Sequence, residues 1–531
     1  MAVQHVRAEA KVSATAPSLT SNEPPTPDFL LVHMLKRITA NEPRWKRLRK
    51  YAQGDPPKAD TPSSVNDEWA EFEQFRQKAR TNYAELVVGA CLDRTIILGF
   101  RTAAAGDEDG DKEAEKLWDA NDMEVRSDRT NGDAFTYGHG YLLADPLSKR
   151  AKDFRPWQAH VMTDSVGDPV VALNIEHNDF ENRDYAYVWE RERDELGMGT
   201  GKVYCHIAVR DRVARVGEDP SEIPRGTYMS RNWTWWKTVE TPLEMIPLVE
   251  FENRDGVGEF ERHTDTLDRI NHMLLQRVVI ATMQAFRQRA LKGNFPKYDE
   301  KGELIDYDQL FPASPGALWL IPAEAELWES QQTSIQDILA SVKDDVRDLA
   351  ATTRTPMTYF SPDAANGSAE GASLQREGYT SKIDDRKARM AGRWRRFMSL
   401  MFQINGDSTR AQLSEIEVIW TPTEVLSLSE RYSAASQAGL SQTPLSLKTI
   451  MREVLHFSPK QMRAAELERI SQALTSAAAT PVNGGSGGQT AGGGTPSLTP
   501  LQQGAASRLS LASSNGATSR TTGASSGRAG N

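Results

Sequence analysis

The 531-residue chain has few cysteines and no long apolar run. Its two cysteines, Cys91 and Cys205, stand in apolar or strand-like contexts, so we expect reduced core residues rather than a disulfide. The longest apolar runs, such as 246–251, are far shorter than the roughly 20 residues that a membrane span needs. The N-terminal stretch lacks the apolar core of a signal peptide. We therefore expect neither a disulfide scaffold nor a membrane protein.

Sequence signatures of catalysis are missing as well. His-Glu-x-x-His and Cys-x-x-Cys do not occur, which argues against a metal site. His139, in the stretch YGHGY, has no Gly-x-Ser-x-Gly elbow to accompany it, so we expect a turn before a strand. The glycine-rich stretch 197–202 lacks the first glycine of a phosphate loop and has Val203 after Lys202, which favours a hairpin turn. We expect no enzyme activity, cofactor or metal.

The acidic stretch 106–116 resembles a calcium loop only in its aspartate spacing. Counting from Asp107, the sixth position is Lys112, where an EF-hand requires glycine. A solvated helix start, with the helix reaching Asn121, is the better interpretation.

The chain carries more acidic than basic residues. Its net charge is −10, and the segment from residue 476 onward holds three arginines and no acid. Without that segment, 60 basic residues face 73 acidic ones, so the body is near −13. A protein that grips DNA is normally basic. If this chain meets DNA, it lets the DNA slide.

The first half reads as helices followed by strands. Residues 1–27 are rich in Ala, Ser, Thr and Pro and are expected to be mobile. Helical spacing is found near residues 29–39, 43–51, 69–80 and 83–98. From residue 135 to 252 the period shifts toward two, which predicts an antiparallel, partly solvated β-rich region. The expected strands are 141–144, 158–162, 170–176, 185–190, 203–210 and 248–252.

The central segment has the most informative order of elements. A long amphipathic helix over 263–292 is followed by a short, proline-broken β-like insert and a second helix over 334–351. Apolar residues lie in step on both helices: Leu267, Ile270, Leu274, Val278, Ala281, Ala285 and Ile335, Ile338, Val342, Val346, Leu349. A Gly/Ser/Pro-rich break over 355–372 precedes a long basic helix over 373–404.

The last part is helical and then of low complexity. A strand is expected at 415–421 and helices near 429–438, 446–455 and 459–474, with Ser446 and Ser458 as N-caps. Beyond about residue 476 the composition is typical of disorder.

Two groups of residues leave alternatives open. Trp233, Trp235 and Trp236 suit base stacking, but packing between domains or subunits is favoured. The arginines of 376–396 suit phosphate contacts, but pairing with acids of a neighbouring helix or subunit is favoured by the acidic body.

Four stretches resemble the portal proteins of tailed bacteriophages, in particular those of siphophages of Gram-positive and actinobacterial hosts. The stretches are LVHMLKRITANEPRWKRLRKYAQGDPP, GDAFTYGHGYLLADP, PLVEFENRDGVGEFERHTDTLDRINHMLLQRVVIATMQAFRQRALKG and TPMTYFSPDAANGSAEGASLQREGYTSKIDD. By element order the resemblance covers roughly residues 28 to 475. It rests on order, since no single phrase is a catalytic signature.

The resemblance implies an α+β portal fold with a β-rich wing, a two-helix stem, a small α/β clip, a long wing helix and a helical crown. The parts it implies are a flexible arm 1–27, the wing 28–262, stem helices 263–292 and 334–353, the clip 293–333, a tunnel loop 354–372, the wing helix and return strand 373–427, the crown 428–475 and a disordered tail 476–531.

The resemblance also implies a role and partners. Portal proteins form a ring, roughly a dodecamer, at one capsid vertex of the virion, which is the channel for packaging and ejection of double-stranded DNA. Expected partners are the terminase large subunit, the major capsid protein, a head-completion or adaptor protein and a scaffolding protein, with assembly in the host cytoplasm.

Three sets of site residues follow as expectations. The tunnel loop, near DNA, would hold Thr355, Met357, Tyr359, Asn366, Gly367, Ser368 and Gly371. The acids lining the channel on the second stem helix would be Asp344, Asp345 and Asp348. The docking surface of the clip would hold Tyr298, Tyr307, Phe311 and Trp319.

Physical reasoning favours the same assembly. Two amphipathic helices joined by an insert cannot bury their stripes alone, whereas a ring of copies buries them against neighbours. Alternatives are another head–tail connector component, which a mass measurement of the oligomer would separate, and a hydrolase or nucleotide-dependent enzyme with an unrecognised site, which an activity screen would reveal.

Overall fold

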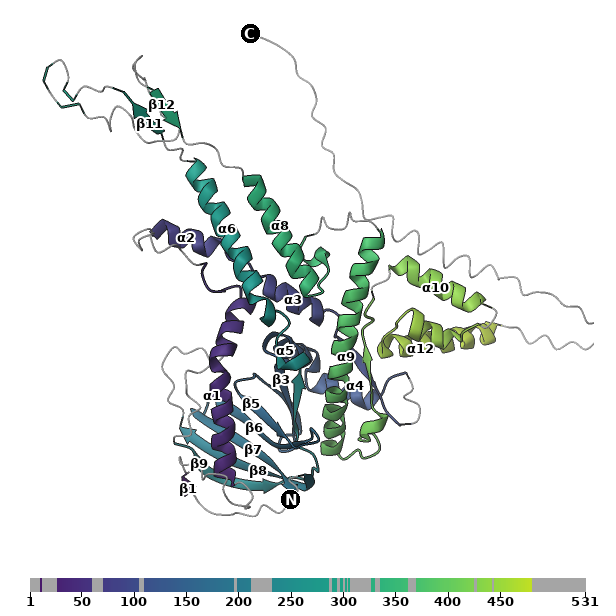
Figure 1. Cartoon of the computed structure of the whole chain (residues 1–531). Coiled ribbons are helices and arrows are strands. Elements are labelled where there is room, and N and C mark those ends of the chain that lie inside the picture. The colour runs from purple at the N-terminus through teal and green to yellow at the C-terminus, as the bar shows by residue number, and fades with distance from the viewer. Residues whose placement is uncertain are drawn as a thin grey trace, which may run out of the picture. The chain divides into compact units, whose positions relative to one another are not determined.

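The computed structural model describes most of the chain: residues 10–11, 26–59, 70–104, 109–194, 198–211, 232–285, 289–293, 297–298, 301–302, 304–305, 326–329, 335–361, 369–424, 427–441 and 444–479. The chain divides into two units, Met1–Glu466 and Leu467–Asn531. The first unit mixes helices with antiparallel sheets (Figure 1), which confirms the α+β class. In the second unit, the described residues belong to helix α12 (Pro459–Ala479), and the tail predicted to be disordered lies almost entirely outside the described residues.

The largest β-structure is a six-stranded antiparallel sheet in the order β1-β9-β8-β7-β6-β5. Its strands are β1 (Ala10–Lys11), β5 (Ala159–Thr163), β6 (Pro169–Asn178), β7 (Arg183–Arg193), β8 (Gly199–Asp211) and β9 (Thr234–Glu240). The predicted strands in β5 to β8 are confirmed, and residues 199–202 of the glycine-rich stretch begin β8, the antiparallel neighbour of β7. The arm expected to be mobile contributes β1, which pairs with β9.

A three-stranded sheet, β10-β3-β4, stacks against the first one. It consists of β3 (His139–Asp145), β4 (Arg150–Phe154) and β10 (Leu248–Glu252). In β3, Tyr141 and Leu143 point into a core shared with the six-stranded sheet, whereas Leu142 and Ala144 belong to the main core. Successive side chains of a strand point to opposite faces, so a strand between two cores is apolar throughout. The prediction of a partly solvated sheet is therefore wrong for β3.

Helix α5 (Met123–Tyr137) lies beside β3 and contacts α1, α3, α4, β4 and β10. The sequence did not predict it, because its residues include Ser, Asp, Thr, Asn and Gly, which are weak helix formers. Packing overrides that propensity: Thr130, Asn131 and Asp133 are buried polar residues of this helix. The helix explains why the β-like period expected from residue 135 begins only at His139.

Two further boundaries differ from prediction. The helix expected over 83–98 is α3 (Tyr83–Leu92), and β2 (Ile97–Arg101) follows, paired with β13 (Glu417–Trp420). The stretches 29–39 and 43–51 form one helix, α1 (Pro27–Ala52), which begins at the cap Thr26 and passes through Pro43. Its inward face is apolar on both sides of the proline, from Leu30 to Tyr51, and packing on that face holds the helix together.

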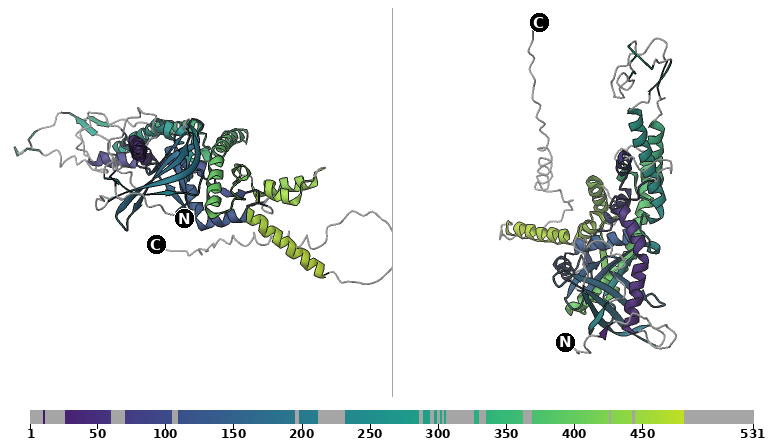
Figure 2. Two further views of the ribbon diagram at one scale, coloured as in Figure 1. Left: turned by 90° about the horizontal axis from the view of Figure 1, so that it is seen from below. Right: turned by 90° about the vertical axis from the view of Figure 1, so that its left-hand side faces the viewer.

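Helix α1 lies across the six-stranded sheet and contacts β5, β6 and β7 (Figure 2). Trp235 of β9 donates from Nε1 to Asp28 of α1 at 2.9 Å. Trp233 is buried, with the Arg210 guanidinium 4.5 Å from its ring centre. These two tryptophans therefore pack the sheet within one chain, whereas Trp236 is 54% exposed.

The glycines around His139 allow close packing. A Cβ on Gly138, at φ 91°, would lie 2.1 Å from the Gly256 carbonyl oxygen, and one on Gly140 would lie 2.1 Å from that of Thr130. His139 itself opens β3 and lies 3.1 Å from Glu250. The YGHGY stretch is thus a helix-to-strand turn, as predicted.

Further helices of the body are α2 (Ala70–Lys78), α4 (Lys112–Ala120), α10 (Leu428–Leu440) and α11 (Leu447–Thr449), which continues as a π-helical turn at Ile450–Val454. Asp111 caps α4 and confirms the expected helix start. Ser446 and Ser458 accept hydrogen bonds from Thr449 and Gln461, as N-caps do. Cys91 and Cys205 are buried free thiols, as expected, and burial raises the pKa of Cys91 to about 11.

Candidate functional site, a helix pair and its buried junction

Helices α6 (Thr264–Ala285) and α8 (Ile335–Thr352) lie side by side and run in opposite directions (Figures 1 and 2). The buried apolar residues of the pair are Leu267, Ile270, Leu274 and Leu275 on α6 and Val342, Val346, Leu349 and Ala350 on α8. They recur every three to four residues, so each helix presents one stripe, and the predicted stripes are confirmed over this half of the pair. The helix expected to reach residue 292 ends at Ala285.

In the half of the helix pair away from this core, the apolar side chains are less deeply buried. Val278 and Val279 of α6, and Ile335 and Ile338 of α8, are only partly buried. Two helices alone cannot enclose these side chains. The described part of the chain therefore covers these side chains only in part.

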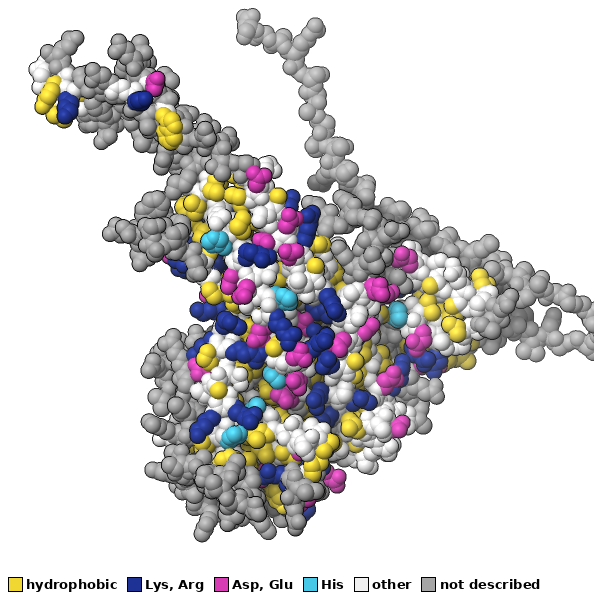
Figure 3. Space-filling model, viewed as in Figure 1, with side chains coloured by type: hydrophobic (Ala, Val, Ile, Leu, Met, Phe, Trp, Pro, Cys, Tyr) yellow, Lys and Arg dark blue, Asp and Glu magenta, His cyan; other side chains and the backbone are white. Residues whose placement is uncertain are grey.

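The three predicted channel acids on α8 do not share one environment. Asp345 is only 14% exposed and accepts from Arg269 of α6 at 2.9 Å, so it lies against the partner helix. Asp344 and Asp348 have side chains 68% and 72% exposed. On the face seen in Figure 3, acidic and basic side chains are interspersed over this region. Of the three acids, Asp344 and Asp348 project from the pair, where Asp344 pairs with Arg347 at 2.8 Å and Asp348 lies 3.7 Å from Arg269.

A two-stranded antiparallel sheet lies between the two helices in the sequence. Strand β11 (Arg289–Lys292) pairs antiparallel with β12 (Glu326–Glu329), which corrects the helical prediction for 289–292. Of the predicted docking residues, Tyr298 is 58% exposed, and Tyr307, Phe311 and Trp319 lie outside the described residues. Trp328 of β12 is 56% exposed and was not singled out from the sequence, although an aromatic side chain in a proline-broken insert is a usable signal.

The break after α8 begins as an ordered turn. Thr355 is buried, Met357 and Tyr359 are partly buried in a 3₁₀ turn (Met357–Tyr359), and the Tyr359 hydroxyl donates to Asp93 at 3.2 Å. Asn366, Gly367 and Ser368 lie outside the described residues. The break expected to reach residue 372 ends earlier, because α9 (Ala369–Asn405) already includes Gly371.

A buried ionic junction connects α8, α9 and the turn before α6. Lys382 of α9 donates to the Thr353 carbonyl at the end of α8, at 2.8 Å, and to Glu259 at 3.0 Å. Arg386, one turn along α9, donates to the other oxygen of Glu259 at 2.5 Å. Asn253 adds a third donor to Glu259 at 3.0 Å.

The charge state of this junction follows from its contacts. Burial by itself raises the pKa of Glu259, but Lys382 and Arg386 outweigh it and lower that pKa to about 2. Lys382 also supplies positive charge at the carboxyl end of α8, where the helix dipole is negative. The junction therefore fixes the middle of α9, at Lys382 and Arg386, to the end of α8.

Four of the basic residues of α9 pair with acids of the same chain, whereas Lys387 donates to Thr421 and Thr423. Besides the junction, Arg389 pairs with Asp385 within the helix at 3.1 Å, and Arg396 lies 3.9 Å from Asp168. This supports the favoured interpretation, pairing with acids, for these residues. The apolar side of α9 is the core: Trp394 packs against Trp118, Phe251 and Phe397.

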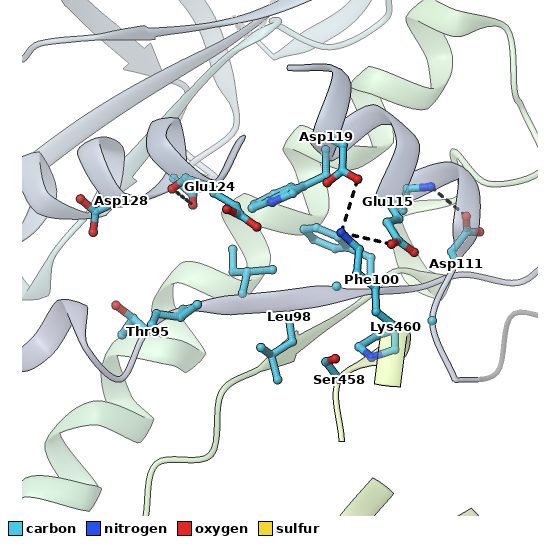
Figure 4. A pocket seen from close by; sticks show the side chains of 18 of the residues that line it. Thr95, Leu98, Phe100, Asp111, Glu115, Asp119, Glu124, Asp128, Ser458 and Lys460 are labelled. Atoms are coloured by element: carbon cyan, nitrogen blue, oxygen red, sulfur yellow. Dashed lines mark hydrogen bonds and ion pairs between the residues drawn. The ribbon is translucent and has the colours of Figure 1, made fainter. Parts of the chain in front are cut away.

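A groove of about 510 Å³ runs between α3, β2, α4 and α5 (Figure 4). Its floor includes Leu98 and Phe100, and its rim carries Glu115, Asp119, Glu124 and Asp128. One end is filled by the first residues of α12, where Lys460 bridges Glu115 and Asp119 at 3.3 and 3.4 Å. The sequence did not single out this groove.

No group of three or more His, Cys, Asp or Glu side chains in the described part of the chain is arranged to hold a metal ion. Over the same residues, no helix has both the length and the apolar character that crossing a membrane requires.

Comparisons with known proteins place the chain in a family. The sequence profile "Phage portal protein, SPP1 Gp6-like" matches residues 33–478. The portal protein of Mycobacterium phage D29 is 22% identical over 375 residues, which span 65% of this chain and 70% of that protein.

Solved structures resemble the chain more distantly. One chain in the neck of an empty GTA particle, computed with C6 symmetry, has 13% identity and a TM-score of 0.38, and the match covers 78% of this chain and 99% of that one. An HK97-family portal protein from Corynebacterium diphtheriae has 12% identity and a TM-score of 0.27, over 64% of this chain and 94% of that one. The profile match, which extends over most of the residues, shows that the chain belongs to the SPP1 Gp6-like family of phage portal proteins.

Proposed function

We propose that this chain forms a closed ring of about twelve copies at one vertex of the capsid, through which double-stranded DNA is packaged and ejected. Portal proteins are structural components of the virion, not enzymes. The observation that carries the proposal is the order α6, two-stranded sheet, α8, break and α9 within a chain of this family. Motor activity would belong to the terminase, which uses the ring as its base.

The elements take the following roles in this proposal. The two sheets with α1 to α5 form the wing, α6 and α8 form the stem, and the two-stranded sheet of β11 and β12 belongs to the clip. The tunnel loop runs from residue 354 to the start of α9 at Ala369, α9 is the wing helix, and α10 to α12 form the crown. The partly buried Val278, Val279, Ile335 and Ile338 support the stem role, because neighbouring stems would cover them.

Of the three predicted acids, Asp344 and Asp348 are the ones that we propose line the channel. Asp344 and Asp348 are exposed and repel the DNA backbone, which keeps phosphates from binding to the wall. In a packaging assay, Asp344→Asn/Asp348→Asn is expected to slow DNA movement or reduce DNA retention. Asp345→Asn, which changes charge inside the helix pair, is the matched control. Unchanged packaging and retention with the double variant would remove this part of the proposal.

The clip is the proposed docking site for the terminase large subunit and later for a head-completion protein. Exposed Tyr298 and Trp328 are suited to it, because aromatic side chains supply large contact areas. The wing and crown would face the major capsid protein and the scaffold.

Gold-labelled antibody against this chain tests the proposal on intact particles. Label at a single vertex, where the tail joins, is the expected result. Label at all vertices, or along the tail, would contradict it and favour a different structural component.

A further inference from the structure

Among the described residues, the start of α12 fills one end of the groove between α3, β2, α4 and α5 and leaves the other end open. At one end, Pro459 lies 3.1 Å from where a Cβ on Gly99 would be, and Lys460 bridges two carboxylates. At the other end, Glu124 and Asp128 of α5 form no salt bridge with a described residue. Figure 4 shows both on the side of the groove away from Lys460.

This end of the groove carries carboxylates and exposed aliphatic surface. Ile96 and Val125 are each 53% exposed beside it. The side-chain oxygen of Asn131, a residue only 2% exposed that lines the groove, has no hydrogen-bond partner. Burial, and then the charge of Asp93, raise the pKa of Asp128 and outweigh the opposing charge of Arg129, so a further cation would be stabilising there. A protein surface that fits this end of the groove would therefore carry hydrogen-bond donors and positive charges, with apolar side chains between the charges.

The same chain carries such a surface on α1. Lys36, Ala40, Pro43, Arg47 and Lys50 are all exposed and recur at intervals of three and four, so they lie within about 80° of the helix circumference. We call this the α1 stripe. Its three cations form no salt bridge with a described residue, and it contains no acid. Pro43, a residue that disfavours helices, lies at the centre of the α1 stripe.

We propose that the α1 stripe of one copy docks in the open end of the groove of the next copy, with Lys36, Arg47 and Lys50 facing Glu124 and Asp128. In Figure 1, α1 and α4 lie on either side of α5. Two different, complementary surfaces on one chain make a heterologous contact, which closes into a ring when its rotation allows. This inference rests on the ring assembly proposed above and identifies one of its contacts.

Charge reversal tests the contact in the full-length protein. Lys36→Glu/Arg47→Glu/Lys50→Glu and Glu124→Lys/Asp128→Lys are each expected to weaken association at least about tenfold, since several ion pairs become like-charge pairs. The chain that carries both sets restores complementary charges, so it is expected to assemble again. Lys149→Glu/Arg183→Glu/Lys202→Glu, an equal charge change on exposed parts of the sheets, is the control and stays assembled.

Native mass spectrometry gives the readout, with circular dichroism confirming that each variant is folded. Rings that persist in both reversed variants would overturn the proposal, and so would folded variants that the combined chain does not rescue. Carbodiimide cross-linking of the unmodified protein is independent of mutation. Lys36 or Lys50 joined to Glu124 or Asp128 between copies is expected, and its absence from an intact ring contradicts the contact. If the unmodified protein forms no ring, the proposed function fails instead.

Discussion

At the residue scale, the carboxylate of Glu259 connects α8, α9 and the turn before α6 through the side chains that donate to it. Its side chain is 3% exposed and takes donors from Lys382, Arg386 and Asn253. A buried ion pair adds little net stability compared with an apolar pair, but a buried charge that has lost its partner is costly. The junction therefore fixes geometry more than it adds stability.

The first prediction concerns Lys382→Met. It leaves Glu259 with fewer donors and the Thr353 carbonyl without its hydrogen bond, so the free energy of unfolding is expected to fall by about 3–5 kcal/mol. Chemical denaturation measures the change. Arg347→Met, which breaks the exposed pair with Asp344, is the control and is expected to cost less than about 1 kcal/mol. Equal losses in the two variants would mean that the junction is not buried in solution.

The second prediction is a pH dependence. The folded-state pKa of Glu259 is about 2, against an ordinary value of 4.5, so its carboxylate stabilises the fold above about pH 4.5. That contribution is lost as the pH falls toward 2. Stability measured against pH is expected to decline less over this window in Glu259→Gln, from a lower starting level. Parallel pH curves for the variant and the unmodified protein would contradict it.

At the element scale, α1 is the clearest case of packing prevailing over local preference. Proline inside a helix removes one hydrogen bond and crowds the carbonyl four residues before it. The helix continues because Leu35 and Ile38 before Pro43, and Trp45 and Leu48 after it, are buried against the same core.

The third prediction follows from this. Pro43→Ala restores the missing N–H in an exposed position, so it is expected to raise the free energy of unfolding by about 1–3 kcal/mol. Thermal unfolding of the purified protein checks it, with Ala40→Gly, also exposed on α1, as a control expected to lower stability by about 1 kcal/mol. A lower midpoint for Pro43→Ala would show that the proline ring packs against another part of the assembly.

The elements differ in how well the sequence predicts them, for physical reasons. Strands β5 to β8 and helices α6 and α8 show regular periods, so the pattern identifies them. Helix α5 is composed of weak helix formers and forms because buried neighbours surround it, which local pattern does not reveal. The end of α6 was overestimated because the apolar stripe does not distinguish a helix from the strand Arg289–Lys292 that follows.

The order of the elements in the candidate site can be predicted from the sequence, but the direction in which its side chains point cannot. The order of helix, insert, helix, break and helix can be read from the sequence. Which of Asp344, Asp345 and Asp348 faces away from α6 depends on the rotation of α8, and that is fixed by Val342, Val346 and Leu349 against the core. The groove is lined by residues from 92 to 460. A periodic pattern along the chain does not reveal that residues so far apart in the sequence lie together.

At the scale of the whole molecule, an acidic body, a partly covered helix pair and two complementary surfaces on one chain favour the same assembly. A fourth prediction belongs here: the ring should be less stable at high salt, because screening weakens the contact of the α1 stripe with the groove. Mass photometry across a salt series measures it, and an assembly that strengthens with salt would indicate apolar contacts alone.

The central claim is that copies of this chain close into a ring around a channel for DNA. A cryo-EM reconstruction of the purified full-length oligomer tests it most directly. The account predicts a closed ring of about twelve copies, with α6 and α8 of each copy around an opening wide enough for a DNA duplex and α1 of each copy against α5 of the next. A monomer, an open filament, or a closed assembly without a central opening would contradict it.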